Sequence, residues 1–162
     1  MKRKWSAFLV ALVWVVPSFS VHADDTSDGR ARAGPLESVA YARVAMNAEG
    51  ETYFADAAAK FELKDFAPPA GPVGVAAQQA AKSVVFTTSD SNWHGDWHPT
   101  PHKQYVFMLG GAIEIKVADG EVRRFSIGDI ILLEDTSGRG HDTRVVSEEP
   151  ALFAIVALPT TP

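Results

Sequence analysis

Residues 104–133 read QYVFMLGGAIEIKVADGEVRRFSIGDIILL, and this stretch decides the fold class. It holds short apolar runs that end at turn signals: Gly-Gly, Asp-Gly and Gly-Asp. The run at 112–117 alternates apolar and charged residues, which is typical of a strand with one buried face. The Asp119-Gly120 pair that follows is a strong hairpin signal. The stretch therefore predicts consecutive short strands rather than helices.

Further short strands are expected on both sides of this stretch, at 52–54, 58–63, 84–88, 141–147 and 151–158. Between them, the connector FAPPAGP at 66–72 excludes a persistent helix because proline cannot donate the backbone hydrogen bond that a helix interior needs. Many short strands, turns roughly every eight to twelve residues and almost no helix favour a β-sandwich or barrel. The predicted fold class is all-β.

The N-terminus is typical of a signal peptide. The basic triplet KRK at 2–4 precedes an apolar run at 7–16, and VHA at 21–23 places small residues before a cleavage position. The apolar run is shorter than the roughly 20 residues of a membrane-spanning helix. An uncleaved membrane anchor is the alternative. Cleavage would leave a periplasmic or secreted protein without a stable membrane anchor.

We accordingly expect a signal peptide at 1–23, a flexible leader at 24–49 and one folded domain at 50–160. The 162-residue chain has a net charge of −5, and without its first 23 residues, which hold three basic and no acidic residues, the charge becomes −8. A domain this acidic is a poor nucleic-acid binder, since phosphate contacts need a clustered positive surface. The chain has no cysteine, which excludes disulfides, thiolate nucleophiles and thiolate metal ligands.

Four histidines follow the expected cleavage position, and three of them lie in the segment NWHGDWHPTPHKQ at 92–104. Imidazole is a common ligand of borderline metals. Two prolines in the segment favour an extended backbone, so alternate residues from His98 to Gln104 are expected on one face. His98, His102 and Gln104 are therefore candidate metal ligands, and His141 would join them from another strand. The alternative is a histidine-rich surface loop that binds no metal.

The segment GDIILLEDTSGRGH at 128–141 resembles the second motif of the cupin superfamily, which runs from a Gly-Asp turn to a histidine. The usual proline of that motif is missing, and Asp135 stands near its place. The first cupin motif is matched less closely. His98 takes the place of its first histidine, Thr100 that of the second, and Gln104 that of the glutamate.

The resemblance is to small single-domain bacterial cupins and covers about residues 50–158. It implies a jelly-roll barrel (a double-stranded β-helix) with a short N-terminal extension. It also implies a divalent metal, which would be Zn, Fe, Ni, Mn or Cu. The implied ligands are His98, Gln104 and His141, with His102 as a replacement for the missing histidine. Without a metal, His102 or His141 could serve as a general base near neutral pH.

Three apolar side chains close to these ligands are expected to contact a small-molecule ligand: Trp97, Phe107 and Leu133. The tryptophans could instead pack in the core, since aromatic side chains bury a large area in small domains. Glu134 is a candidate catalytic carboxylate at the mouth of the barrel. Asp135 is expected to make hydrogen bonds within its own loop, and Asp96 and Asp142 to lie on the surface or to orient a histidine.

Two function classes remain open at this point. The first is an exported cupin that binds a divalent metal and acts on a small organic molecule as an oxygenase, isomerase, lyase or hydrolase. The second is a cupin that binds or senses a small ligand or a metal without turnover, and the altered first motif favours it. The resemblance also implies a homodimer.

Overall fold

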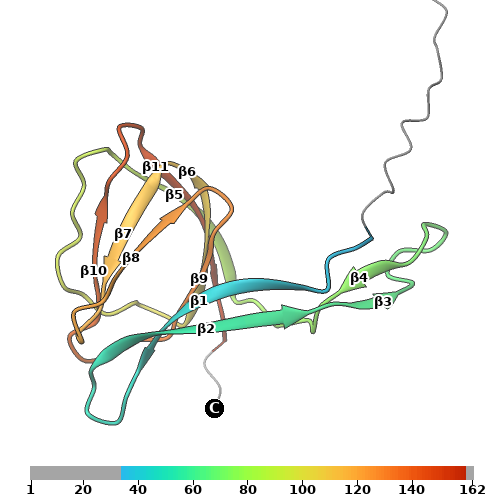
Figure 1. Ribbon diagram of the computed structural model, residues 1–162, viewed down its shortest axis with the longest axis horizontal. Coiled ribbons are helices and arrows are strands. Elements are labelled where there is room, and N and C mark those ends of the chain that lie inside the picture. The colour runs from blue at the N-terminus through green and yellow to red at the C-terminus, as the bar shows by residue number, and fades with distance from the viewer. Residues whose placement is uncertain (1–33, 160–162) are drawn as a thin grey trace, which may run out of the picture. The chain divides into compact units, whose positions relative to one another are not determined.

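The computed structural model describes residues 34–159, which form eleven strands and no helix (Figure 1). The strands are β1 (Ser38–Met46), β2 (Thr52–Lys60), β3 (Glu62–Lys64), β4 (Val73–Val75), β5 (Ser83–Ser89), β6 (Gln104–Gly110), β7 (Ala112–Lys116), β8 (Val122–Ser126), β9 (Ile130–Leu133), β10 (Asp142–Val145) and β11 (Ala151–Ala157). The predicted all-β fold class is confirmed. The expected signal peptide at 1–23 lies outside the described residues.

The strands form two larger sheets around one hydrophobic core. One sheet has the order β2-β1-β9-β6-β11-β5 and the other the order β10-β7-β8, while β3 and β4 pair only with each other. Buried side chains of both sheets meet in the core, among them Val44 of β1, Met108 of β6, Ile131 of β9 and Ile115 of β7. Two sheets that share one core are the arrangement expected of a jelly-roll barrel.

The alternation of side chains along β6 decides which residues reach the barrel interior. Gln104, Val106 and Met108 are buried, whereas Tyr105 and Phe107 are only partly buried. Successive side chains of a strand point to opposite faces of its sheet. Tyr105 and Phe107 therefore lie on the outer face, where their ring centroids are 6.1 Å apart.

The Asp119-Gly120 turn joins β7 to β8 as the sequence predicted. The backbone of Gly120 has a φ of +95°, which a residue without a Cβ adopts at little cost. The Asp119 carboxylate accepts a hydrogen bond of 2.8 Å from the backbone N–H of Glu121. This short connection places β7 and β8 side by side in the smaller sheet, opposite β6 and β9.

Strand β1 lies inside the range 24–49 that was expected to be a leader, so the sheet begins before the expected domain start at residue 50. It pairs antiparallel with β2 and parallel with β9, and Val44 is fully buried. Most of its residues are small or only partly buried, so the sequence window alone carries a weak strand signal. Its two neighbours in the sheet supply the hydrogen bonds that hold it extended.

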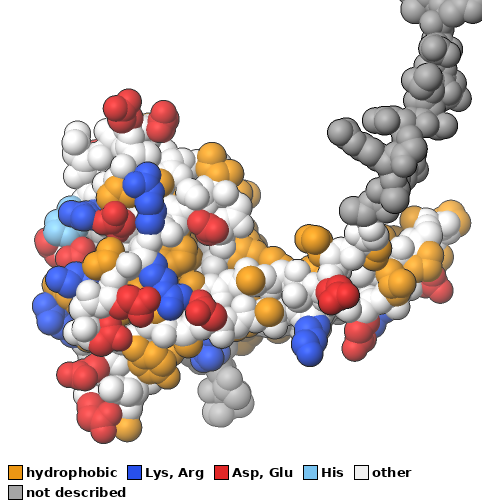
Figure 2. Space-filling view, in the orientation of Figure 1, with side chains coloured by type: hydrophobic (Ala, Val, Ile, Leu, Met, Phe, Trp, Pro, Cys, Tyr) orange, Lys and Arg blue, Asp and Glu red, His pale blue; other side chains and the backbone are white. Residues whose placement is uncertain are grey.

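The surface carries charges of both signs. Figure 2 shows acidic and basic side chains interspersed over the part of the molecule where the two larger sheets lie. Several of them are paired: Arg123 lies 2.6 Å from Asp56 and Arg144 lies 2.6 Å from Glu114. Residues 34–159 hold no helix with the length and hydrophobicity needed to cross a bilayer.

Candidate functional site

A cavity of about 190 Å³ lies between the two larger sheets. The strands β6, β7, β9 and β11 contribute mostly aliphatic and aromatic side chains to its wall, including Leu133 and Ile155. His98, Gln104 and His141 also line it. The cavity therefore brings together three of the four residues that the sequence predicted as metal ligands.

His141 is held by a buried carboxylate. Its ring nitrogen Nδ1 lies 2.6 Å from Oδ2 of Asp135, and the two side chains are 4% and 0% exposed. The aspartate is itself positioned through its backbone, because its carbonyl oxygen accepts a 3.0 Å hydrogen bond from the N–H of Thr100. A carboxylate oxygen accepts the hydrogen bond, so the proton sits on Nδ1 and a neutral His141 keeps its Nε2 lone pair free.

His98 is held in a similar way by a backbone carbonyl. Its Nδ1 lies 2.8 Å from the carbonyl oxygen of Asp96, which can only accept a hydrogen bond. The proton is therefore on Nδ1, and Nε2 of His98 is again left without this partner. The rings of His98 and His141 lie with centroids 4.8 Å apart.

The main chain fixes the distance between these two histidines. His98 and His141 exchange two backbone hydrogen bonds of 3.0 Å each, and so form an isolated antiparallel bridge. Gly140, with a φ of +77°, lies directly against this bridge. A Cβ at Gly140 would overlap the backbone of His98 and Pro99. The close approach of the two chain segments therefore depends on glycine at this position.

Gln104 is the first residue of β6 and pairs in register with Leu133 of β9. It is 9% exposed, and its side chain lines the cavity beside the two histidines. A buried amide offers one oxygen acceptor and two N–H donors. In contrast to the glutamate of the cupin motif, it brings no negative charge to the cavity.

The structure does not bring His102 to the cavity. The side chain of His102 is exposed, and its carbonyl oxygen accepts a 3.1 Å hydrogen bond from the hydroxyl of Thr100. The expected common face required an extended chain from residue 98 onward, but β6 begins only at Gln104 and the preceding residues bend. The alternation of a strand therefore does not apply to His102.

Of the three expected contacts to a small molecule, Leu133 lines the cavity, while Trp97 and Phe107 do not. The guanidinium of Arg139 lies over the Trp97 ring, 3.7 Å from its centroid. Phe107 lies on the outer face of its sheet because of the alternation along β6. Two aromatic side chains do line the cavity, Phe153 and Trp93, and the sequence did not distinguish Trp93 from Trp97.

Glu134 is held away from the cavity by two cations. Its carboxylate lies 2.5 Å from Arg43 and 2.6 Å from Lys103. Burial raises the pKa of Glu134, but the hydrogen bonds and charges of Lys103 and Arg43 outweigh burial and hold this pKa below its usual value. The side chain joins β1 to the end of β9, and it is not among the residues that line the cavity.

Sequence reasoning missed the role of Asp135. The residue was expected to make loop hydrogen bonds, but its carboxylate is fully buried against His141, and Oδ1 has no hydrogen-bond partner among the described residues. A signal was present, since a carboxylate replaces the usual proline six residues before the motif histidine. Which way its side chain points could not be read from the sequence.

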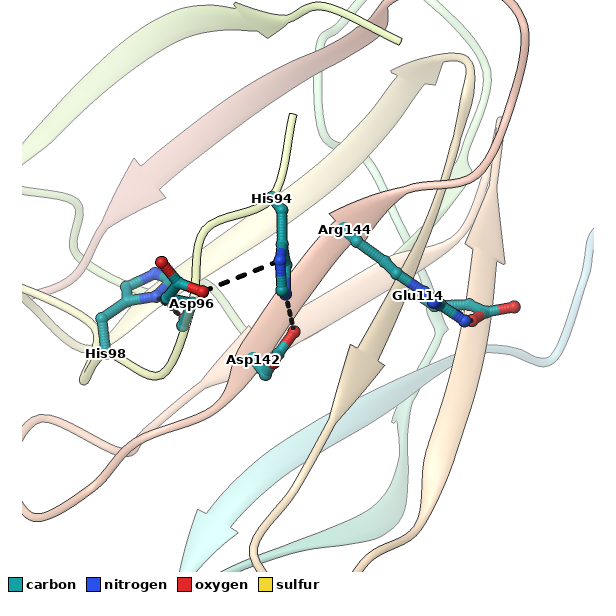
Figure 3. Close-up of polar contacts among 6 residues, drawn as sticks. All are labelled: His94, Asp96, His98, Glu114, Asp142 and Arg144. Atoms are coloured by element: carbon teal, nitrogen blue, oxygen red, sulfur yellow. Dashed lines mark hydrogen bonds and ion pairs between the residues drawn. The ribbon is translucent and has the colours of Figure 1, made fainter. Parts of the chain in front are cut away.

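A second group of polar side chains lies near His98, and Figure 3 shows its members together with that histidine. His94 contacts Asp142 at 2.8 Å through Nε2 and lies 3.7 Å from Asp96 through Nδ1. The ion pair between Glu114 and Arg144 lies beside it. These side chains, Asp96 excepted, border a surface groove of about 560 Å³ that contains none of His98, Gln104 and His141.

No three His, Cys, Asp or Glu side chains within residues 34–159 are grouped as a metal site of those residue types alone would require. The cavity offers two imidazoles and one amide, with Asp135 behind one of the imidazoles. Any metal bound here would depend on Gln104 or on ligands from outside the described residues.

No protein-family profile and no curated protein matches this chain. Several solved structures are similar to it at low identity. The cupin domain of Schizosaccharomyces pombe Cnp3 is 12% identical, with a TM-score of 0.39 over 76% of this chain and 86% of that one. A structure described as ethanolamine utilization protein Q of Salmonella typhimurium is 18% identical, with a TM-score of 0.36 over 79% of this chain and all of that one.

A Streptococcus pyogenes protein of unknown function is 21% identical, with a TM-score of 0.36 over 53% of this chain and 72% of that one. Similarity at these identities and scores carries no function from one protein to another. A cupin domain is thus among the solved structures that this chain is similar to, and the similarity concerns the fold alone.

Proposed function

We propose that this chain binds a divalent transition metal and a small organic molecule in the cavity between its two larger sheets. His98, Gln104 and His141 would hold the metal. The single observation that carries the proposal is that both imidazoles have Nδ1 engaged by an oxygen acceptor, at 2.8 Å and 2.6 Å. Metal-binding histidines almost always donate their other ring N–H to a carboxylate or a carbonyl in this manner.

The chemistry of the donors indicates which metals would fit. Two imidazoles and a neutral amide suit Zn²⁺, Ni²⁺, Cu²⁺ or Fe²⁺ better than Ca²⁺ or Mg²⁺, which prefer several carboxylate oxygens. A metal with open positions would polarise a carbonyl or activate a water molecule. The chain itself fixes the two rings through Asp135 and the carbonyl of Asp96.

The cavity also limits the class of small molecule. It measures about 190 Å³, and no Lys, Arg, Asp or Glu side chain lines it. An aliphatic cavity of about 150 Å³ accommodates a molecule the size of benzene. We therefore expect a ligand with one small ring or a short branched chain, mostly apolar, with one polar group that reaches the histidines. Apart from the proposed metal, the cavity offers no cationic side chain to a sugar phosphate or a dicarboxylate.

The alternative is a cupin that binds this small molecule without a metal and without turnover. The specific observation in its favour is the neutral Gln104 where the cupin motif has a glutamate, together with the lack of a third histidine in the cavity. The two proposals differ in whether His98 and His141 bind a metal or donate and accept hydrogen bonds to the ligand.

Metal titration of the full chain tests the main proposal. Isothermal titration with Zn²⁺ and with Ni²⁺ should give one site per chain, and His98→Ala and His141→Ala should each weaken it by more than about 100-fold, since losing even an outer partner of a ligand costs up to that factor. His102→Ala is the matched control and should bind as the wild type does. Wild-type protein that binds no metal, with a melting temperature unchanged by added metal, would reject the metal site and leave the alternative.

A further inference from the structure

The buried Asp135 carboxylate has a role beyond orienting a ring. We propose that Asp135 supplies, through His141, the negative charge that the metal site lacks because Gln104 is neutral. This inference rests on the metal site proposed above. It assigns Asp135 as a positioning and charge-supplying residue that does not itself touch the metal.

The Asp135 carboxylate is isolated from solvent and pairs with no side chain of the described residues except His141. Asp135 is 0% exposed, and its only side-chain partner among the described residues is His141. A buried carboxylate is costly unless a positive charge or several hydrogen bonds compensate it. The cations nearest in sequence are already engaged elsewhere, Arg139 with the ring of Trp97 and Arg144 with Glu114. Among the described residues, His141 is therefore the side chain through which the positive charge of a bound metal would compensate this carboxylate.

One oxygen of the Asp135 carboxylate has no hydrogen-bond partner among the described residues. Oδ2 accepts the 2.6 Å hydrogen bond from His141, whereas Oδ1 is buried with no hydrogen-bond partner among the described residues. A carboxylate that accepts many hydrogen bonds has its charge stabilised locally. Here a single short contact carries almost all of that stabilisation. The charge therefore acts mainly on the imidazole and makes Nε2 of His141 a stronger electron donor.

The neutral amide of Gln104 belongs to the strand next to the one that leads to Asp135. Gln104 pairs in register with Leu133, two residues before Asp135 on the adjacent strand. The amide and the buried carboxylate thus approach the cavity from neighbouring strands, β6 and the end of β9. A carboxylate at position 104 would contact the metal directly, whereas the Asp135 carboxylate would act on the metal through His141. The net charge of the site is the same in both arrangements.

Four versions of the full chain test whether Asp135 supplies the charge that Gln104 lacks: wild type, Asp135→Asn, Gln104→Glu and the double variant. The readout is Zn²⁺ affinity by competition with a chromophoric chelator. Asp135→Asn should weaken binding by about 10- to 100-fold, the usual cost of losing such a partner. Gln104→Glu should restore most of that loss in the Asp135→Asn background and strengthen binding less in the wild-type background, whereas a merely structural role for Asp135 would give equal gains in both.

The outcomes separate the two proposals. If the wild type binds no Zn²⁺, the proposed metal site fails, and this inference fails with it. If the wild type binds Zn²⁺ and Asp135→Asn binds it equally well, only the role of Asp135 is overturned. A folded double variant that stays as weak as Asp135→Asn also overturns it.

A measurement on unaltered protein covers the case in which Asp135→Asn does not fold. Nitrogen NMR of His141 should show the proton on Nδ1 with and without Zn²⁺, and the Nε2 signal should shift more than the Nδ1 signal when Zn²⁺ binds. A proton found on Nε2, or a larger Zn²⁺-induced shift at Nδ1 than at Nε2, would mean that Asp135 does not act through this ring. Either result rejects the inference.

Discussion

The two histidines of the cavity are held by partners of different charge. His141 faces the carboxylate of Asp135, whereas His98 faces the carbonyl oxygen of Asp96. A carboxylate increases the donor strength of the opposite ring nitrogen more than a neutral carbonyl does. We therefore expect His141→Ala to weaken Zn²⁺ binding more than His98→Ala. Equal losses in the two variants would show that the charge on the partner has no effect.

A pH-dependent contribution to stability is expected from Glu134. Its pKa is lowered in the folded protein, so the stability that it contributes is complete above its unfolded pKa of about 4.3 and is lost as the pH falls through the lower folded value. Glu134→Gln should lower the melting temperature at pH 7 by a few degrees. The difference from wild type should shrink below about pH 4.

Thermal unfolding followed by circular dichroism between pH 3 and pH 7 measures this effect. Glu49→Gln, on an exposed turn, is the control and should change little at either end of the range. A Glu134→Gln difference that stays constant across the range would show that the ion pairs to Arg43 and Lys103 contribute nothing.

The sequence predicted part of the site because its chemistry depends on residue type. The cavity receives His98, Gln104 and His141, and cupin-like spacing was enough to select them. His102 could not be excluded in advance because its direction depends on where β6 begins. Asp135 could not be assigned because burial is decided by the packing of the whole loop, which no short motif encodes.

At the scale of elements, the segment before β6 behaves as an additional strand beside β10. Trp93 accepts a backbone hydrogen bond from Val145, Gly95 donates one to Thr143, and His98 exchanges two with His141. Because this segment carries both His98 and Trp93 into the cavity wall, its pairing with β10 determines the shape of the site. Any change that separates the segment from β10 should affect stability and binding together.

Gly140→Ala tests that dependence. The substitution adds a Cβ at a positive φ of +77° and against the backbone of His98 and Pro99. The backbone conformation alone costs about 1–2 kcal/mol, so the melting temperature should fall by several degrees or more. Zn²⁺ binding should weaken as well, because His98 must move.

Gly120→Ala is the matched control for this substitution. Gly120 also has a positive φ, of +95°, but a Cβ there would meet no atom within 4 Å. It should lose stability from the backbone alone and retain full Zn²⁺ affinity. Similar Zn²⁺ affinities for the two glycine variants would mean that the bridge at Gly140 does not position His98.

Most strands could be predicted because their boundaries are set by local turn chemistry. The strands β5, β7, β10 and β11 lie within a residue or two of their expected ranges, and the turn at Gly120 is where the Asp-Gly pair predicted it. The segment at 36–47, which contains β1, could be a short helix or a strand on its sequence alone, since an Ala-rich sequence such as SVAYARVAM has no marked preference. Its conformation comes from β2 and β9, which are separate in sequence.

At the scale of the whole molecule, the expected signal peptide leads to a prediction about location. In a Gram-negative host, the full chain should be recovered from the periplasm or the medium with its N-terminus at Asp24. Edman sequencing of the purified protein would measure this directly. A deletion of residues 2–23 is the control and should remain in the cytoplasm. Recovered protein that still carries residues 1–23 would contradict cleavage and favour a membrane anchor.

The parallel pairing of β1 with β9 has a consequence for the time course of folding. Arg43 and Glu134, which join these strands, are 91 residues apart in the chain. The inner strand β1 therefore cannot pair with β9 until that strand has been synthesised, which happens much later. Contacts between segments so far apart in the chain slow folding. Export through a secretory channel needs a chain that has not yet folded. If the chain is exported as its N-terminus predicts, this topology would give a newly made chain time to reach the channel before the sheet closes around the histidines.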